Sequence, residues 1–98
     1  MREIKIGAIY KHFKGKLYLV LDIVNDSESN NDIEYKKVVI YQALYGGGTK
    51  WARPYEMFAS KVDHKKYPDI KQVYRFEEVE EVSAKWWNHQ KYGNKEFK

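Results

Sequence analysis

Short runs in which apolar and polar residues alternate dominate the chain up to about residue 80. Residues 8–13, 17–24 and 34–44 are rich in Val, Ile, Leu and Tyr and predict three strands. The glycine of "FKGK" separates the first two, and the polar "NDSESNND" separates the second from the third. In residues 17–24 both alternating faces are largely apolar, which predicts a central strand covered on two sides.

Glycine and proline mark the remaining boundaries. Gly46–Gly48 can adopt positive φ and predicts a hairpin reversal, with residues 49–53 as the return strand. Pro54 should end that strand, and "PYEMF" is expected to form one helical turn whose Tyr55, Met57 and Phe58 fill the core. Two weaker patterns follow, a short strand at 61–63 and a last strand at 73–79.

These elements predict an all-β fold. Five or six short strands without a long amphipathic helix favour a small closed barrel, because a flat sheet would leave edges and an apolar face exposed. The 98 residues allow one core. We expect a barrel domain over residues 1–82 and a basic, aromatic carboxy-terminal tail over residues 83–98. Trp86 and Trp87 of this tail either dock on the barrel or form an interface with a partner.

Four segments carry a family resemblance. "GAIYKHFKGKLYLVLDI", "VVIYQALYG", "WARPYEMF" and "YRF" resemble the small bacterial DUF1653 family, over roughly Ile6 to Glu78. The resemblance implies an SH3-like β-barrel and implies no activity. Ser27 and Glu28 fit the family's "RHSET"-like loop, but Asp26 stands where a histidine is expected, so a proton-transfer role for that histidine does not carry over.

Composition narrows the function classes. The net charge of +4 permits binding to a polyanion without requiring it. Cysteine is absent, which excludes disulfides, thiolate metal ligands and a cysteine nucleophile. No apolar run is long enough for a signal peptide or a membrane span, so a cytoplasmic protein without membrane contact is expected.

Trp51 and Arg53 are the leading binding candidates. They lie two residues apart on the predicted return strand and therefore share a face. An exposed indole can stack on a base while the guanidinium pairs with phosphate or carboxylate. The alternative places Trp51 in the core and satisfies Arg53 with loop carbonyls or with Glu28 or Glu56.

A second set of aromatic residues could extend such a surface. With nearby lysines they would form a basic platform of ring faces, as small barrels use for single-stranded nucleic acid. The alternative is ordinary solvated lysines beside half-buried tyrosines. The set consists of Tyr10, His12, Tyr18, Tyr41 and Tyr45.

Features that support catalysis are few. The three histidines show no metal-ligand spacing, and Gly46–Gly48 lack the order of a phosphate-binding loop, so no metal and no cofactor are expected. A hydrolase would have to combine Ser27 and Glu28 with His12, without the nucleophile elbow that usually presents a serine.

The sequence therefore favours a non-catalytic recognition module. The first hypothesis is binding of single-stranded nucleic acid or another polyanion. The second is a protein or peptide interaction module, with a homodimer as one form. The third is the small hydrolase around Ser27 and Glu28.

Overall fold

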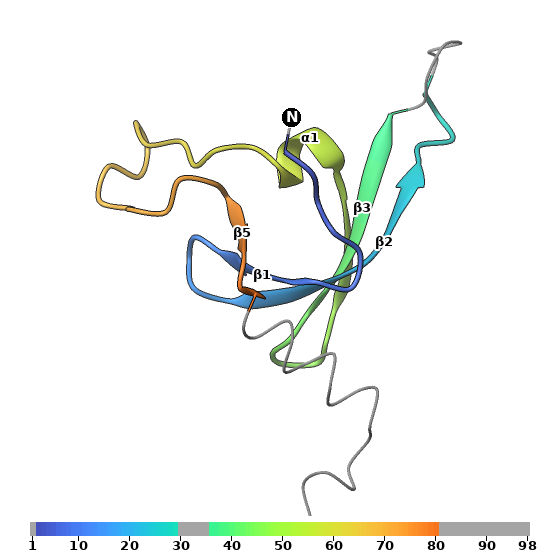
Figure 1. The fold of residues 1–98 in the computed structure, drawn as a ribbon, viewed down its shortest axis with the longest axis horizontal. Helices are drawn as coiled ribbons and strands as arrows, with labels where there is room; N and C mark the ends of the chain where they lie inside the picture. The colour runs from blue at the N-terminus through green and yellow to red at the C-terminus, as the bar shows by residue number, and fades with distance from the viewer. Residues whose placement is uncertain (1, 30–35, 81–98) are drawn as a thin grey trace, which may run out of the picture.

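Five strands form one antiparallel sheet in this computed structural model, which describes residues 2–29 and 36–80 (Figure 1). The strands are β1 (Ile9–His12), β2 (Leu17–Asn25), β3 (Lys37–Ala43), β4 (Lys50–Pro54) and β5 (Phe76–Glu78), and one helical turn, α1 (Tyr55–Phe58), follows β4. Their order across the sheet is β4-β3-β2-β1-β5. The all-β fold predicted from the sequence is confirmed.

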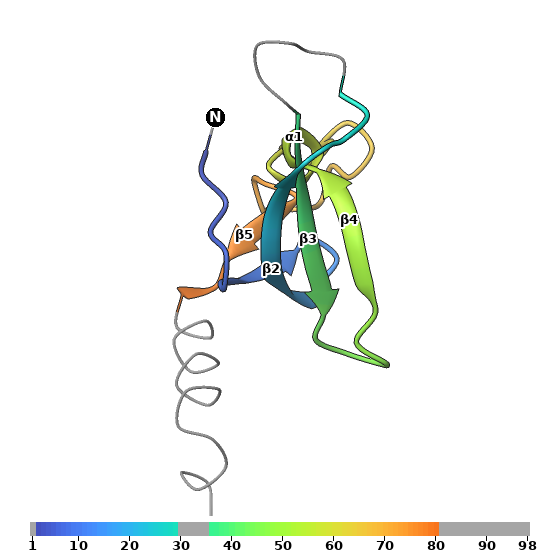
Figure 2. The ribbon, with the colours of Figure 1, turned by 90° about the vertical axis from the view of Figure 1, so that its right-hand side faces the viewer.

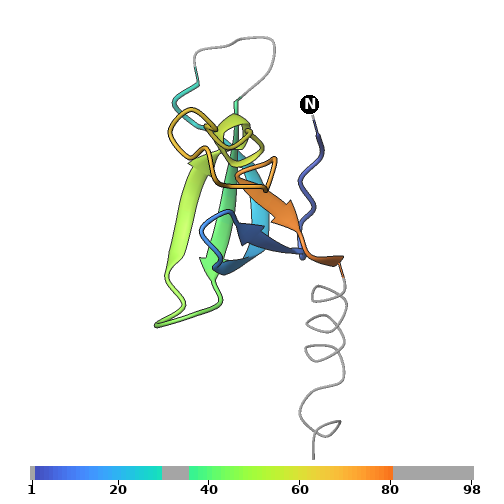
Figure 3. The ribbon, with the colours of Figure 1, turned by 90° about the vertical axis from the view of Figure 1, so that its left-hand side faces the viewer.

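The sheet curls because β2 bends between its two neighbours. The first residues of β2 pair with β1, while its whole length from Tyr18 onward pairs with β3. The register shifts between Val20 and Asp22, and such a bulge increases the local twist. As a result β1 and β5 cross the direction of β3 and β4, as Figures 2 and 3 show from opposite sides. The sheet is barrel-like, with a concave side that encloses the core.

Aromatic rings fill that concave side. Phe58 of α1 and Phe76 of β5 stack with ring centroids 4.0 Å apart and an interplanar angle of 6°. The rings of Tyr10 and Tyr41 meet Phe58 edge-on, and Val20 and Val39 are fully buried beside them. Burying each large side chain contributes about 1.5–3 kcal/mol, so α1 and β5 supply much of the stability of the core.

The predicted turn and helix are present. Gly46 and Gly48 adopt positive φ between β3 and β4, and the Gln42 amide donates a 2.9 Å hydrogen bond to the Gly48 carbonyl. The helical turn begins at Tyr55, directly after Pro54 ends β4. The triple glycine is thus a hairpin reversal, as its conformational freedom predicts.

Three expectations about the core and the strands are wrong. Along β2 only Val20 is fully buried, because the described residues cover this single sheet on its concave side and not on the other. Met57 is 50% exposed, since a helix of one turn can bury only one face, which here carries Phe58. Lys61 forms an isolated bridge with Tyr74 instead of a strand, and β5 covers three residues only.

The amino-terminal segment closes one end of the core. The Arg2 guanidinium lies 4.1 Å from the Tyr74 ring centroid and donates hydrogen bonds to the carbonyls of Ala59 and Phe76. The Tyr55 hydroxyl accepts a 2.7 Å hydrogen bond from the Ile4 amide. These contacts tie the start of the chain to α1 and to the segment before β5. Within the described residues, no helix has the length and apolar character needed to cross a membrane.

Candidate functional site

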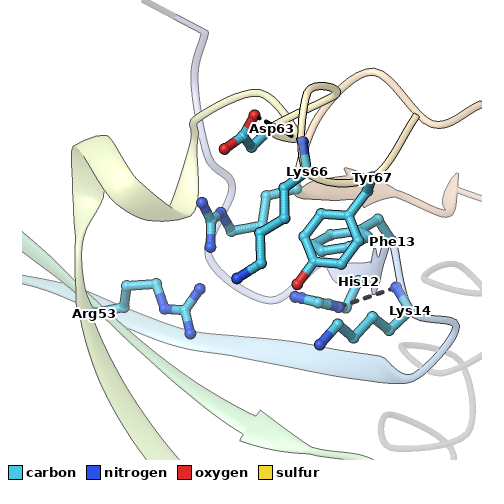
Figure 4. Close-up of a pocket in the computed structure, with 8 residues that line it drawn as sticks. His12, Phe13, Lys14, Arg53, Asp63, Lys66 and Tyr67 are labelled. Atoms are coloured by element: carbon cyan, nitrogen blue, oxygen red, sulfur yellow. Dashed lines mark hydrogen bonds between the residues drawn. The ribbon is translucent and has the colours of Figure 1, made fainter. Parts of the chain in front are cut away.

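A basic pocket of about 340 Å³ opens between the end of β1, strand β4 and the connection from α1 to β5, residues 59–75 (Figure 4). The side chains that point toward its centre come from all three segments, so the fold and not a local motif assembles it. The residues lining the basic pocket are His12, Phe13, Lys14, Arg53, Asp63, Lys66, Tyr67 and Arg75.

Arg53 reaches the basic pocket from β4. Its cross-strand partner on β3 is the buried Val39, so both side chains lie on the concave side of the sheet. The guanidinium carbon lies 5.5 Å from the centroid of the Phe76 ring. Nη1 is buried and has no hydrogen-bond partner among residues 2–29 and 36–80. A buried donor left in this state costs about 1–3 kcal/mol, which an incoming acceptor would recover.

His12, the last residue of β1, is held in the pocket as a neutral ring. It stacks on Phe13 at 4.4 Å and meets Phe76 edge-on at 4.9 Å. Nδ1 accepts a 3.1 Å hydrogen bond from the Lys14 amide, which leaves the ring proton on Nε2. Burial, with the positive charges of Arg53, Arg75 and Lys14, lowers the pKa of His12 to about 4. At neutral pH Nε2–H is therefore an uncharged donor.

The connection between α1 and β5 is folded by its own backbone. Its two ends are joined by hydrogen bonds from Val62 to Val73 and from Arg75 to Ser60. Asp63 Oδ1 accepts from the amides of Lys65 and Lys66 at 3.1 and 3.3 Å, and so forms a local turn. That turn presents the next side chains, Lys66 and Tyr67, to the basic pocket.

Positive charge in the basic pocket is not neutralised. Lys14, Arg53, Lys66 and Arg75 face a single carboxylate, Asp63, and none of the four makes an ion pair within the described part of the chain. The ammonium groups of Lys14 and Lys66 each lie 5.5 Å from the Tyr67 ring centroid. Arg75 Nε donates to Ser60 Oγ at 3.3 Å. This arrangement suits an anion that accepts hydrogen bonds.

Aromatic residues extend the site along the concave side. The hydroxyls of Tyr18 and Tyr45 are 2.7 Å apart, and the Tyr18 ring contacts that of His12. Burial and the hydrogen bond to Tyr45 raise the pKa of Tyr18 to about 12, so the Tyr18 hydroxyl stays uncharged. Trp51 lies one pleat from Arg53 on the same face of β4 and is 51% exposed. We call Tyr18, Tyr45 and Trp51 the aromatic strip.

The structure brings together five of the residues proposed from the sequence, among them Tyr18 of the aromatic strip. His12 and Arg53 line the basic pocket, while Tyr45 and Trp51 are exposed beside it. The alternative that placed Trp51 in the core is wrong, and so is the alternative that paired Arg53 with a carboxylate or loop carbonyls. Position on β4 explains the exposure of Trp51, because β4 is the last strand at that edge in the described part of the chain.

Tyr10 and Tyr41 do not belong to an exposed surface. They are 2% and 4% exposed, and the expectation that their rings face solvent is wrong. Both lie on the concave face and pack against Phe58. The Tyr10 hydroxyl accepts a 2.9 Å hydrogen bond from the Lys5 amide, which lets a tyrosine occupy the core with its polar end satisfied.

Ser27 and Glu28 lie far from His12. They follow the end of β2 in the direction of the gap before β3, whereas His12 adjoins the beginning of β2 (Figure 1). The nine residues of β2 separate them by roughly 30 Å of strand. The catalytic arrangement that the hydrolase hypothesis requires is not formed. Trp86 and Trp87 lie outside the described residues.

The sequence pattern does not indicate five residues of the basic pocket, one of which is Asp63. Phe13, Lys66, Tyr67 and Arg75 come from a turn and from segments with little periodicity. The available signal was the pairing of cations with aromatic residues in "HFK", "KKY" and "YRF". Within the described ranges, no three His, Asp or Glu side chains gather in a way that could hold a metal ion.

Comparison with known proteins gives one result about ancestry. No curated protein and no solved structure matches the chain. The family model described as "Protein of unknown function (DUF1653)" matches residues 8–78, which include all five strands, α1 and every residue of the basic pocket. The match covers well over half of the sequence, and the chain therefore belongs to the DUF1653 family.

Proposed function

We propose that this protein is a non-catalytic module that binds single-stranded nucleic acid. The observation that carries the proposal is the basic pocket, in which four cations face one carboxylate beside the exposed Trp51. Lysine and arginine attract the phosphate backbone, and exposed rings stack on unpaired bases.

The geometry supports a single strand in particular. Arg53 and Trp51 share one face of β4 about 7 Å apart, the spacing of one pleat. A phosphate held at Arg53 would therefore leave a neighbouring base within reach of the Trp51 ring. A base in a duplex is already stacked, so only an unpaired base can use this ring.

Fluorescence anisotropy with a labelled single-stranded oligonucleotide tests the proposal. If each of the four cations neutralises one phosphate, the slope of log K against log salt is about −3. Affinity then falls about fifty-fold for a fourfold rise in salt. Absence of binding at low salt would show that the proposal is wrong.

Matched variants on one strand locate the site. Lys50 and Arg53 both belong to β4, but their side chains point to opposite faces of the sheet. Arg53→Gln and Trp51→Ala should each weaken binding at least tenfold, while Lys50→Gln, which removes the same charge from the other face, should change it less than threefold. Equal losses for Lys50→Gln and Arg53→Gln would indicate attraction by net charge alone.

A peptide ligand is the second candidate, and the open edge of β4 favours it. Among the strands that the structure describes, β4 has a neighbour on one side only, so an extended peptide could add to the sheet there, next to Trp51. Backbone pairing of this kind depends weakly on salt. Binding of peptides, but not of oligonucleotides, that persists at high salt would select this function.

A further inference from the structure

The basic pocket carries donors for more acceptor oxygens than a phosphate inside a nucleic acid strand offers. An internal phosphodiester has one negative charge and two free oxygens. A phosphate monoester at the end of a strand has close to two charges and three free oxygens. The two groups can therefore be distinguished by the number and the placement of the donors.

Two donors in the basic pocket have no hydrogen-bond partner among the described residues. Arg53 Nη1 is buried and unpaired. His12 Nε2 carries the ring proton, because Nδ1 accepts from the Lys14 amide, and it has no hydrogen-bond partner among the described residues. In Figure 4 the ring of His12 and the guanidinium of Arg53 approach the centre of the pocket from different sides.

Two lysine ammonium groups approach the basic pocket from a third side. The ammonium of Lys66 descends from the connection above the pocket, and that of Lys14 approaches from the turn after β1 (Figure 4). The carboxylate of Asp63 offsets only one of the four positive charges, and its Oδ1 is engaged by two backbone amides of its own turn. Donors that converge from three sides with excess positive charge match the three oxygens of a dianionic end group.

The size of the basic pocket agrees with an end group. Its volume of about 340 Å³ is near the lower limit of pockets that hold small molecules. It offers room for a phosphate with part of one nucleoside, while the remainder of a strand would continue over the aromatic strip.

On this basis, and resting on the proposed function, we propose that the basic pocket binds a phosphate monoester. Arg53 and the neutral His12 donate to its oxygens, and Lys14 and Lys66 balance its second charge. The group is either the terminal phosphate of a single strand or the phosphate of a free nucleotide.

Oligonucleotides of one sequence that differ only at their ends test the inference. Three are compared by anisotropy, with a 5′-phosphate, with a 3′-phosphate, or with hydroxyls at both ends, and the label is placed on an internal base. At least one phosphorylated strand should bind tenfold or more tightly than the hydroxyl strand. Equal affinity for all three would overturn the inference while leaving the proposed function intact. If none of the strands binds, the proposed function fails.

A competitor separates the two sources of the phosphate. Adenosine monophosphate, at equal concentration, should displace the phosphorylated strand poorly if the ligand is a strand end, because it gains nothing from the aromatic strip. Displacement as effective as that by the unlabelled strand supports a free nucleotide as the source. Binding of adenosine monophosphate in the absence of any strand binding would support the monoester site alone.

Substitutions identify the side chains that donate hydrogen bonds to the phosphate monoester. Arg53→Gln and His12→Asn should remove most of the preference for the phosphorylated end, and Lys50→Gln should retain it. His12→Asn is chosen because its side-chain oxygen can still accept from the Lys14 amide, and near-ultraviolet circular dichroism confirms that each variant is folded. A preference that survives in both pocket variants would show that the monoester binds elsewhere.

Discussion

Acidification should destabilise this protein through His12 in a pH range where most proteins are stable. Burial and the surrounding positive charges of Arg53, Arg75 and Lys14 lower the pKa of His12 from 6.5 in the unfolded chain to about 4. Between these two values the unfolded chain binds a proton at His12 and the folded protein does not. His12 therefore costs the folded protein no stability above about pH 6.5, and it lowers the free energy of unfolding progressively as the pH falls toward 4.

The size of the effect follows from the two pKa values. At pH 5, values of 6.5 and about 4 give an upper limit of about 2 kcal/mol for the loss of unfolding free energy relative to pH 7. The ring is partly exposed, and solvent screening reduces this to about 1 kcal/mol.

Urea denaturation of the wild-type protein and of His12→Asn at pH 7, 6 and 5 measures the effect. Every other side chain is the same in both proteins, so the difference between the two isolates His12. The wild-type protein should lose about 1 kcal/mol more than the variant between pH 7 and pH 5. If the difference in unfolding free energy between the two proteins stays the same within a few tenths of a kcal/mol over this pH range, the stated environment of the His12 ring is refuted.

Two further substitutions test particular contacts by urea denaturation. Arg53→Met removes the buried, unpaired Nη1. The substitution should raise the free energy of unfolding by about 1 kcal/mol and abolish oligonucleotide binding. A loss of stability would contradict this account of Arg53. Gly48→Ala should cost roughly 1–2 kcal/mol, because φ is +69° and a Cβ would lie 3.2 Å from Gln42 Nε2. Gly47→Ala is the matched control, since Gly47 is outside the positive-φ region with open space around it, and its cost should stay within a few tenths of a kcal/mol.

Alternation along the chain was sufficient to predict the elements that form the sheet. Residues in β1 to β4 show the period of two, and Gly46–Gly48 and Pro54 mark the turn and the end of β4 through their backbone restrictions. The same alternation could not say which face of each strand is concave. It therefore treated Tyr10 and Tyr41 as surface residues, although tertiary packing against Phe58 buries them.

The candidate site was predictable only in part, for a topological reason. Arg53 and Trp51 share a strand face, which a sequence shows directly. Lys66 and Arg75 reach Arg53 only because the connection after α1 folds back over the end of β1, a contact between segments with no shared period. The neutral state of His12 likewise depends on burial and on nearby cations, of which Arg75 is brought near it by this connection.

The position of Phe76 late in the sequence has a consequence for biosynthesis. Its ring contacts those of His12, Tyr18, Tyr41 and Phe58, and the strand that carries it pairs with β1, near the other end of the domain. A nascent chain cannot complete this aromatic cluster until residue 76 has left the ribosome. Until then the rings of the earlier segments lack their central partner, so the native core cannot be completed before β5 emerges.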